Sequence, residues 1–493
     1  MSPSPTPGTT EQIIVVGRAE DLLGSASTSS EGTIGASELV DRPISRRGEV
    51  LEAVPGVIVT QHSGEGKANQ YFLRGFNLDH GTDFALSVDD MPINLRTHAH
   101  GQGYADLNFI IPELIERIDY SKGPFNAEVG DFSAAGAAQL HLYRELTQGF
   151  VTLSIGQDNF YRLVLGDTIR LSASTSLTAA FELGPYGGPF VVNQNSNRFN
   201  GYLSYNWGDK TDQFNLTGMF YHGHFHSPDQ VPERAIDEGL IPRFGSIDPT
   251  DSGISDRDSL SFDWLHNDGD GVTHLNVYGF YYDLDLFSDF TYFLDDPVNG
   301  DQFHEADRRF VSGVTLEHTW TPVLFGQAMT ETIGLQATND YIPEVALFHT
   351  KHTVYLSTIR DDTVEEASIG LFQRNEIRWT PWFRSIFGLR ADLYNFDVDS
   401  NLAANSGDVF DGIVSPKLNL VFGLWDETEF YLNVGSGFHS NDARGVTASV
   451  SPSTDEPLKP AAPPRSLEKR RDRIAHLDRA EPDQHCLALL SHP

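Results

Sequence analysis

The chain has 493 residues, 39% of them hydrophobic and 11% aromatic, a composition that suits a folded protein and excludes global disorder. Its 34 lysines and arginines stand against 69 aspartates and glutamates, a formal charge of −35 at pH 7. Nucleic acid is therefore not expected as a partner, because its phosphates would be repelled. No apolar run approaches the roughly 20 residues of a membrane-spanning helix, which leaves open a membrane barrel with alternating strands.

Residues 1–40 are rich in serine, threonine, glycine and proline, and we expect a flexible leader there. They contain one short β-like segment, EQIIVVGRAE, at residues 11–20. This segment is either a stray apolar patch or a docking strand that pairs with the sheet edge of another protein. The opening MSPSPTPGTTEQ lacks the basic and apolar regions of a secretory signal, so none is predicted at this start.

Residues 41–147 have the sequence pattern of a compact α+β domain. RGEVLEAVPGV spaces Val50, Leu51 and Val54 as in a short amphipathic helix that ends at a Pro-Gly pair. VIVTQH, YFLRGF and FALSVDDMPIN predict short strands with turn residues between them. IPELIERIDYSKGP predicts a helical start, with its proline near the first turn, followed by a strand.

From residue 148 the pattern indicates β structure throughout, with about 13 or 14 strands up to residue 436. Leu260, Phe262 and Trp264 alternate with serines and an aspartate, as expected for a wall with an apolar outer and a polar inner face. Short turns such as HNDGDG, TPW and LWDET alternate with long polar excursions near residues 222–257, 285–308, 340–366 and 397–411. An outer-membrane barrel has such tight turns at one end and long loops at the other, whereas a β-sandwich has no reason for this alternation.

Residues 41–145 resemble the plug domain of TonB-dependent outer-membrane receptors. The segments LEAVPGVIV, YFLRGF, SVDDMPIN and IPELIERIDYSKGPFNAEVG occur in the order of that family, and the β-rich region extends the resemblance to about residue 458. Where many members have a glycine-rich YG…GGVINI segment, this chain has FNAEVGDFSAAGAAQLHLY, which indicates a subfamily. The resemblance implies a membrane β-barrel with an N-terminal α+β plug domain, and about 14 of the 22 strands of the family architecture are expected here.

The resemblance also implies a domain organisation and a set of partners. The expected parts are a leader at 1–40, a plug domain at 41–147, an incomplete transmembrane barrel at 148–458 and an atypical tail at 459–493. The leader segment resembles a TonB box, whose strand for pairing with the TonB energy-coupling protein would be Ile13, Ile14, Val15 and Val16. The other expected partners are outer-membrane lipid and a small-molecule metal chelate or other nutrient, at the outer membrane of a Gram-negative cell.

The sequence INLRTHAHGQGYADLNF, residues 93–109, lies where the family places a substrate-facing plug loop. The candidate ligand-binding residues in the outward plug loops are His80, Arg96, His98, His100 and Tyr104. Arg96 and Tyr104 favour an anionic organic chelate over a bare cation, because guanidinium pairs with carboxylate and an aromatic ring stacks. The alternative is that the histidines only hydrogen-bond backbone in glycine-rich turns.

A metal site is a further possibility that the sequence leaves open. Residues two apart in an extended segment point the same way, so His98 and His100 are candidate ligands of one ion. The candidates for a third ligand are His80 and the first long excursion, where His222, His224 and His226 in YHGHFH repeat this spacing. Neutral imidazoles suit Zn, Ni or Cu.

Residues 459–493 do not alternate as the preceding residues do. They carry seven lysines and arginines against five acidic residues, and they include Cys486, the only cysteine. We interpret this tail as the product of a shifted reading frame, with about eight barrel strands missing. A native basic helical tail is the alternative.

The sequence thus predicts a TonB-dependent active transporter of a scarce chelated nutrient such as a ferric siderophore. The alternatives are a non-transporting remnant or surface-binding protein, or a different cargo, either a transition-metal ion or another large nutrient. No nucleophile–base set, phosphate loop or paired-carboxylate signature occurs, so neither an enzymatic activity nor a cofactor is predicted.

Overall fold

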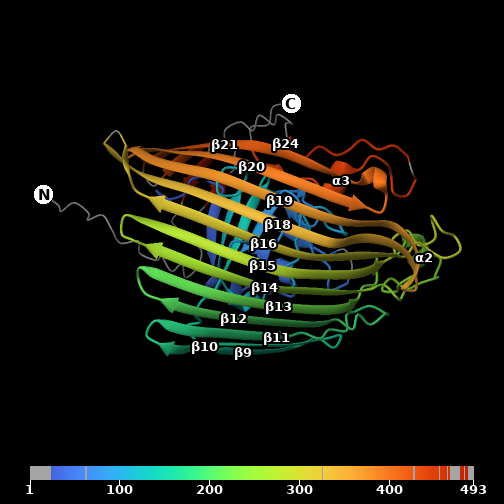
Figure 1. Cartoon of the computed structure of the whole chain (residues 1–493). Helices are drawn as coiled ribbons and strands as arrows, with labels where there is room; N and C mark the ends of the chain where they lie inside the picture. Colours follow the sequence, from blue (N-terminus) through green and yellow to red (C-terminus); the bar gives the residue numbers. More distant parts are fainter. Residues whose placement is uncertain are drawn as a thin grey trace.

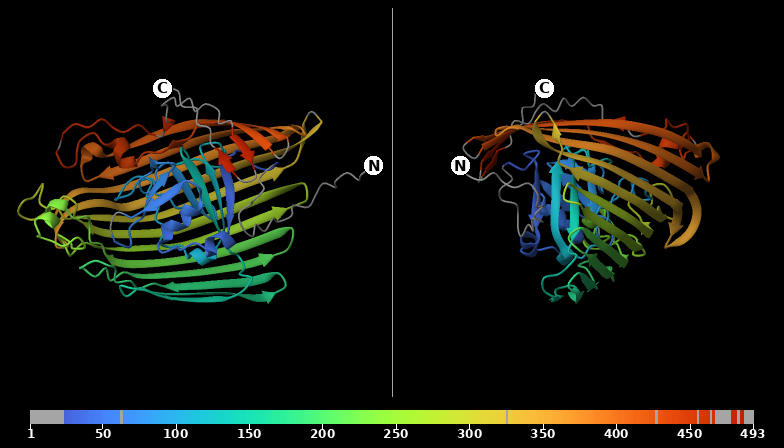
Figure 2. Two further views of the ribbon diagram at one scale, coloured as in Figure 1. Left: turned by 180° about the vertical axis from the view of Figure 1, so that it is seen from behind. Right: turned by 60° about the vertical axis from the view of Figure 1, so that its left-hand side comes forward.

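The computed structural model describes residues 24–61, 64–324, 326–425, 428–454, 456–463, 465–466, 478–481 and 484–486. A large curved antiparallel sheet forms the outside of the molecule, and a smaller part packs against its concave side (Figure 1). The view from behind in Figure 2 shows this inner part, built from the N-terminal elements and here called the plug, in the hollow of the sheet.

The plug is built around one five-stranded sheet and one three-stranded sheet. The larger sheet has the order β1 (Glu31–Gly35), β7 (Ile115–Lys122), β8 (Gly136–Leu142), β5 (Phe84–Val88), β6 (Met91–Pro92). The smaller one has the order β2 (Val57–Thr60), β3 (Gln70–Leu73), β4 (Phe76–Asn77). The short helices of the plug are α1 (Ala36–Val40), η1 (Arg47–Ala53) and η2 (Pro112–Leu114). The predicted α+β character is confirmed, and the helix expected in RGEVLEAVPGV is the 3₁₀ helix η1, with Val50, Leu51 and Val54 fully buried.

The expected leader is shorter than predicted. Strand β1 pairs with β7 along its whole length, and Ile34 is fully buried in the plug core. The prediction of a flexible leader up to residue 40 is therefore wrong for residues 31–40, because a strand with a partner satisfies its backbone hydrogen bonds in the sheet. The TonB-box candidates Ile13, Ile14, Val15 and Val16 lie outside the described residues.

The outer sheet, here called the wall, contains thirteen long strands in which each pairs antiparallel with the next along the chain. They are β9 (Phe150–Ile155), β10 (Tyr161–Ser172), β11 (Thr175–Leu183), β12 (Asn197–Gly208), β13 (Asp212–His226), β14 (Ser252–Asn267), β15 (Gly271–Ser288), β16 (Phe303–Trp320), β18 (Gln327–Lys351), β19 (Val354–Thr380), β20 (Phe383–Ser400), β21 (Gly407–Trp425) and β22 (Thr428–Gly435). The short β17 (Val323–Leu324) pairs with β18 only. Among the described residues, β9 has no pairing with the far edge of the sheet, so the wall is open (Figure 2).

The remaining elements are short and lie between or after the long strands. They are α2 (Glu233–Asp237), η3 (Ala403–Asn405), β23 (Phe438–His439), α3 (Ala443–Thr447), β24 (Arg465–Ser466), β25 (Asp478–Glu481) and β26 (Gln484–Cys486). Strand β25 extends the wall beyond β22, and β26 pairs with β25. In the part of the chain that the structure describes, no helix is long and apolar enough to cross a membrane.

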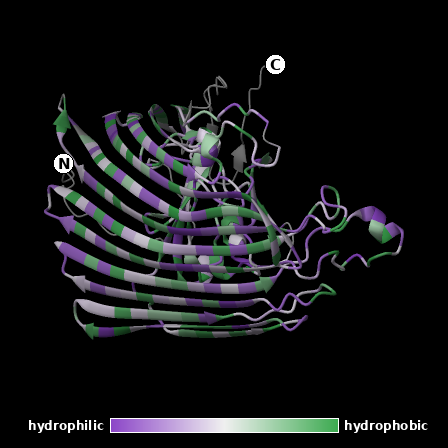
Figure 3. Ribbon diagram, turned by 45° about the vertical axis from the view of Figure 1, so that its right-hand side comes forward, coloured by the Kyte–Doolittle hydropathy of each residue, from purple (hydrophilic) through white to green (hydrophobic). Residues whose placement is uncertain are grey.

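The two faces of the wall alternate as predicted. Leu260 is 57% exposed on the outside, whereas its neighbours Ser259 and Ser261 are 7% exposed and point inward. In β20, Leu389 and Leu393 are exposed between buried polar residues. Apolar and polar residues alternate along the strands in Figure 3, which is the pattern of a wall with lipid outside and a polar filling inside.

The connections have the predicted alternation of length, with two corrections. The excursion expected at 397–411 is a short connection of residues 401–406, because β20 continues to Ser400 and β21 begins at Gly407. Turns at 173–174, 209–211, 268–270 and 381–382 lie at one end, and long connections at 184–196, 227–251 and 289–302 lie at the other. The excursion expected at 340–366 is not a loop, because β18 and β19 continue to a tight turn at 352–353. Polar residues do not interrupt strand pairing where both faces of a hairpin can meet water.

Candidate functional site

A tight loop of the plug, residues 95–104 and here called the apex loop, carries most of the candidate residues. Leu95 and Tyr104 close it with a backbone hydrogen bond of 2.9 Å. Gly103 has a φ of +74°, and a Cβ there would lie 3.0 Å from the Phe132 ring and 3.1 Å from the Thr82 hydroxyl. Glycine thus permits both the turn and the close packing of the loop on the plug.

The apex loop lies at the long-loop end of the wall. The Ala99 N–H donates to the Asp307 carboxylate at 2.9 Å, and the Arg309 guanidinium donates to the Thr97 carbonyl at 2.6 Å. Both wall residues belong to the first part of β16, directly after the long connection at 289–302. From a third segment, Arg444 donates to the His98 carbonyl at 2.7 Å. The wall therefore holds the loop by its backbone.

A buried network of ion pairs orients the wall side chains that hold the apex loop. The Arg309 guanidinium lies 2.7 Å from the carboxylates of Asp307 and Asp340, and neither the Arg309 nor the Asp307 side chain is exposed. Two carboxylates around one guanidinium compensate the charge that burial would otherwise penalise. The sequence offered a signal for this network, because period-2 alternation puts Glu305, Asp307 and Arg309 on one face of HEADRR.

His98 has a structural position within the loop. Its Nδ1 accepts the His100 backbone N–H at 3.1 Å, its Nε2 lies 3.2 Å from the Tyr282 hydroxyl, and its ring stacks on Tyr104 at 4.0 Å. Burial lowers the pKa of His98 well below its usual range, so the ring is neutral. The Tyr104 hydroxyl accepts the Ala68 N–H at 2.9 Å, and Tyr104 is only 1% exposed. Neither side chain presents a polar group to solvent.

Arg96 connects the plug with the wall. It donates from Nε to Asp131 and from Nη2 to the Ser368 hydroxyl, each at 2.8 Å, and it lies over the Tyr394 ring. The same side chain borders a cavity of about 600 Å³ between plug and wall. Arg96 is therefore engaged in the plug–wall contact and is not directed at the outside.

Two of the candidate histidines do meet. His80, in the connection after β4, and His100 in the apex loop place their Nε2 atoms 3.2 Å apart. The Ala105 N–H donates to the His80 carbonyl at 2.8 Å, which fixes the two loops to each other. Sequence reasoning paired His98 with His100 instead, because it could not see that the turn at residues 101–103 folds the loop back towards residue 80.

The three histidines of YHGHFH are elsewhere. They alternate in β13 with Tyr221 and Phe225, which are buried towards the plug, so they point to the other face of the wall. His222 is half exposed and pairs with Asp256 at 2.6 Å. The structure therefore does not assemble the predicted five-histidine metal set. Period 2 gives these three residues a common side, but it is the outer side.

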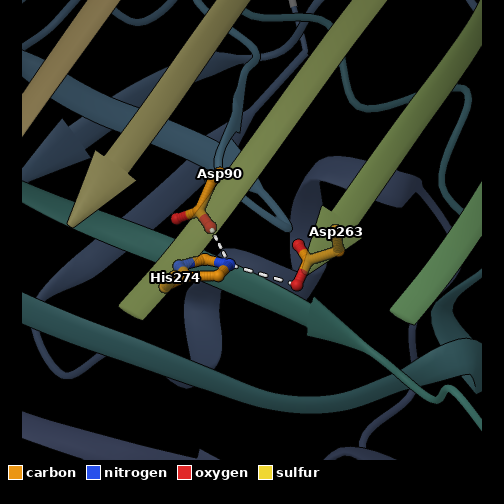
Figure 4. A group of neighbouring side chains, drawn as sticks. All are labelled: Asp90, Asp263 and His274. Atoms are coloured by element: carbon orange, nitrogen blue, oxygen red, sulfur yellow. Dashed lines mark hydrogen bonds and ion pairs between the residues drawn. The ribbon is translucent and has the colours of Figure 1, made fainter. Parts of the chain in front are cut away.

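A second polar cluster, not predicted from the sequence, is formed by Asp90, Asp263 and His274 (Figure 4). Asp263 and His274 lie near the short turn that joins β14 and β15. His274 Nε2 on β15 is 3.1 Å from Asp263 on β14 and 3.7 Å from Asp90 of the plug. It is the one group of three metal-capable side chains found among the described residues. Arg144, which follows the plug, already donates to Asp263 at 2.8 Å. The cluster is thus an ion-paired contact between plug and wall, made by segments too far apart in sequence to be associated beforehand.

Comparison with known proteins agrees with this architecture. The model of the TonB-dependent Receptor Plug Domain matches residues 24–137, and that of the TonB dependent receptor-like, beta-barrel matches residues 185–461. The chain is similar to the ferric citrate transporter FecA in the unliganded form, with 14% identity and a TM-score of 0.71 over 83% of this chain. It is also similar to the ferric yersiniabactin uptake receptor FyuA from Yersinia pestis, with 13% identity and a TM-score of 0.67 over 83% of this chain.

A third similar structure is the copper transporter OprC, with 17% identity and a TM-score of 0.66 over 88% of this chain. The match covers 63% of the FecA chain, 65% of the FyuA chain and 66% of the OprC chain. The chain thus spans less than two thirds of the length of each. Structural similarity at such low sequence identity shows the fold and does not identify the substrate.

Proposed function

Because the chain belongs to the TonB-dependent receptors of the outer membrane, which are not enzymes, we propose that it takes up a scarce metal chelate, such as a ferric siderophore, with energy delivered through TonB. The observation that carries the proposal is the clamped apex loop. Arg309 and Arg444 hold its backbone at the long-loop end of the wall. A ligand that settles on this end meets plug and wall together, so binding can bias the contact between them.

The proposed class of cargo, a metal chelate, is supported by the similar structures and by the residues at the long-loop end of the wall. Structures with this fold include a ferric citrate transporter, a ferric yersiniabactin uptake receptor and a copper transporter. Arg96 and Tyr104 are occupied by contacts inside the protein, so the recognition of an organic chelate falls to the long connections at 227–251 and 289–302. We propose that the residues of the leader, Ile13, Ile14, Val15 and Val16, pair with TonB as an added strand.

Energy-dependent uptake tests this function. Cells that lack their own receptors would express either the full chain or a variant without residues 11–20, and accumulation of labelled ferric chelates would be followed. The full chain should accumulate label, and the deletion should abolish accumulation while surface binding persists. Equal uptake by the two chains would contradict a TonB-dependent mechanism.

A further inference from the structure

The cluster of Asp90, Asp263 and His274 brings one side chain of the plug to two side chains of the wall (Figure 4). His274 Nε2 lies 3.1 Å from Asp263 Oδ1 and 3.7 Å from Asp90 Oδ2. A carboxylate can only accept, so the nitrogen carries the hydrogen that joins these groups. A transition-metal ion binds histidine at this same nitrogen, in place of the hydrogen.

The separations within the cluster suit the coordination sphere of a metal ion. Nitrogen and oxygen ligands lie about 2.0–2.2 Å from Zn²⁺, so two of them in a tetrahedral arrangement are roughly 3.3–3.5 Å apart. The two separations from His274 Nε2, 3.1 Å and 3.7 Å, lie on either side of this range. One donor atom from each of the three residues lies within 4.8 Å of the other two. An ion therefore requires only small shifts of the three side chains.

The plug residue of the cluster is presented by the tight turn between β5 and β6. Asp89 and Asp90 both have left-handed backbone conformations, with φ of +43° and +66°, which aspartate adopts more readily than most residues. Asp90 Oδ1 accepts a hydrogen bond of 2.7 Å from the Gln139 side chain. The second oxygen, Oδ2, is the one that approaches His274. The turn thus directs one carboxylate oxygen at the wall.

Asn276 orients the cluster from the wall. Its Nδ2 donates to Asp263 Oδ2 at 3.0 Å and to the Asp89 carbonyl at 3.3 Å, and the residue is fully buried. Asn276 therefore holds the Asp263 carboxylate and also joins β15 to the turn that carries Asp90. Partners of this kind fix the ligating groups of metal sites, because they determine which oxygen faces the ion.

The charges around the cluster favour a divalent cation. Glu317 on β16 is the cross-strand neighbour of His274, and both residues border the cavity of about 600 Å³ between plug and wall. The carboxylates of Asp90, Asp263 and Glu317 contribute three negative charges, and Arg144, paired with Asp263, neutralises one of them. A proton on His274 neutralises one more, whereas a divalent ion neutralises both that remain.

The cavity supplies a path for the ion and room for a further ligand. Among the described residues, eight acidic side chains and four arginines border it, so the cavity attracts cations. Three protein ligands with one position left for water are typical of Zn²⁺ sites that are open to exchange. A nitrogen ligand suits Zn²⁺ and its transition-metal neighbours, whereas Mg²⁺ and Ca²⁺ take oxygen ligands.

We propose that Asp90, Asp263 and His274 form a binding site for a divalent transition-metal ion, with Zn²⁺ the best fit, and that this ion bridges plug and wall. An ion in this position ties the β5–β6 turn to the β14–β15 hairpin more firmly than the ion pair does. The proposal goes beyond the uptake of a chelate, because it concerns the contact between plug and wall and not the recognition of cargo.

Metal binding to the purified full-length chain in detergent tests the site. After removal of metals with a chelator, Zn²⁺ would be titrated calorimetrically, with Mg²⁺ as the negative ion. We expect one equivalent of Zn²⁺ whose binding is weakened about 100-fold or more by His274→Gln and by Asp90→Asn, since each removes a ligand and not merely an orienting partner. Bound Zn²⁺ should also slow hydrogen exchange of residues 84–92, in the native chain and not in the Asp90→Asn protein.

The control variant is His266→Gln. It removes a histidine near the same hairpin turn that pairs with the Asp212 carboxylate at 2.8 Å, and it should leave the titration unchanged. Near-ultraviolet circular dichroism would show that each variant is folded.

Three results would overturn the proposal. The first is absence of Zn²⁺ binding by the native chain, and the second is unchanged binding by a folded His274→Gln protein. The third is a loss in His274→Gln without a loss in Asp90→Asn, because the ion would then sit on the wall alone. Failure of the uptake experiment leaves this site standing, since binding is measured on the isolated protein.

Discussion

Arg309 shows at the scale of a single residue how the plug is held. Its guanidinium spans two wall carboxylates and the carbonyl of Thr97 in the apex loop, all without exposure of its own side chain. Its neighbour Arg308 points to the other face, where it is 44% exposed and pairs with Asp283 and Glu344. These adjacent arginines of one strand are thus expected to contribute differently to the free energy of unfolding, because only Arg309 neutralises buried charge.

We predict that Arg309→Ala destabilises the protein by about 3–5 kcal/mol, because it leaves the carboxylates of Asp307 and Asp340 buried without a partner. Arg308→Ala, the matched control, should cost less than about 1 kcal/mol, since its pairs are exposed to water. Denaturant unfolding in detergent measures both, and hydrogen exchange of the apex loop should rise in the first variant only. Equal stabilities would mean that Arg309 does not hold the plug.

At the scale of elements, the apex loop and the β18–β19 hairpin differ in how far the sequence defines them. Towards its turn the hairpin loses the regular alternation of polar and apolar residues, and its pairing has register shifts between Ile342 and Val345 and between Leu347 and Phe348, so the sequence pattern predicts a loop there. The apex loop has little regular structure, yet its glycines and its contacts with the wall specify one path. Local polarity is thus a poor guide to where a strand ends when its partner strand continues with it.

Gly103 tests how strictly the apex loop is specified. Gly103→Ala must place a Cβ about 3.0 Å from the Phe132 ring at a φ of +74°, so we expect a loss of about 2–4 kcal/mol from conformation and crowding together. Gly75→Ala has a similar φ of +81° with no atom within 4 Å, so it isolates the conformational part, about 1–2 kcal/mol. Thermal unfolding of the two variants gives the difference. If the Gly103→Ala protein were as stable as the Gly75→Ala protein, the apex loop would accommodate the added methyl group without crowding, against the prediction.

The whole molecule is a wall with its apolar side outside and a plug in its hollow (Figures 2 and 3). This arrangement inverts the usual position of apolar side chains, as exposed Leu260, Phe310 and Leu371 illustrate. Lipid must cover this surface, since the exposure of so many apolar side chains to water would be energetically unfavourable. The plug in turn presents polar and charged groups to the inner face, where Asp90, Arg96 and His98 meet the wall.

Lipid contact makes a prediction at this scale. Leu260, near the middle of β14, is 57% exposed on the outer face, so Leu260→Arg should lower stability in a bilayer by about 2–4 kcal/mol. Leu240 is 71% exposed in the long connection after β13, where water is the solvent, and Leu240→Arg should have no such effect. Refolding into lipid vesicles, read by denaturant titration, compares the two. Equal behaviour would contradict a membrane position for β14.

Much of this architecture could be predicted because its signals are local. Alternation of period 2 in segments such as residues 259–264 determines which side chains share a face, and the regular spacing of turns determines how many strands follow one another. The order of the plug segments identified the family for the same reason, since each short segment carries its own signature. The outward position of His222, His224 and His226 could not be derived in this way. These histidines alternate with Tyr221 and Phe225, and a wall that is apolar outside would have placed the two aromatic rings on the outer face.

The sequence by itself determined the class of fold and which residues of a strand share a face, because those depend on neighbours a few positions away. Only the tertiary structure decided which distant groups meet. His80 and His100 face each other because a glycine turn reverses the apex loop and a backbone hydrogen bond from Ala105 joins it to the connection after β4. Arg309 reaches Thr97 because the wall curves around the plug. Such encounters depend on how whole elements pack, and no pattern within one segment records them.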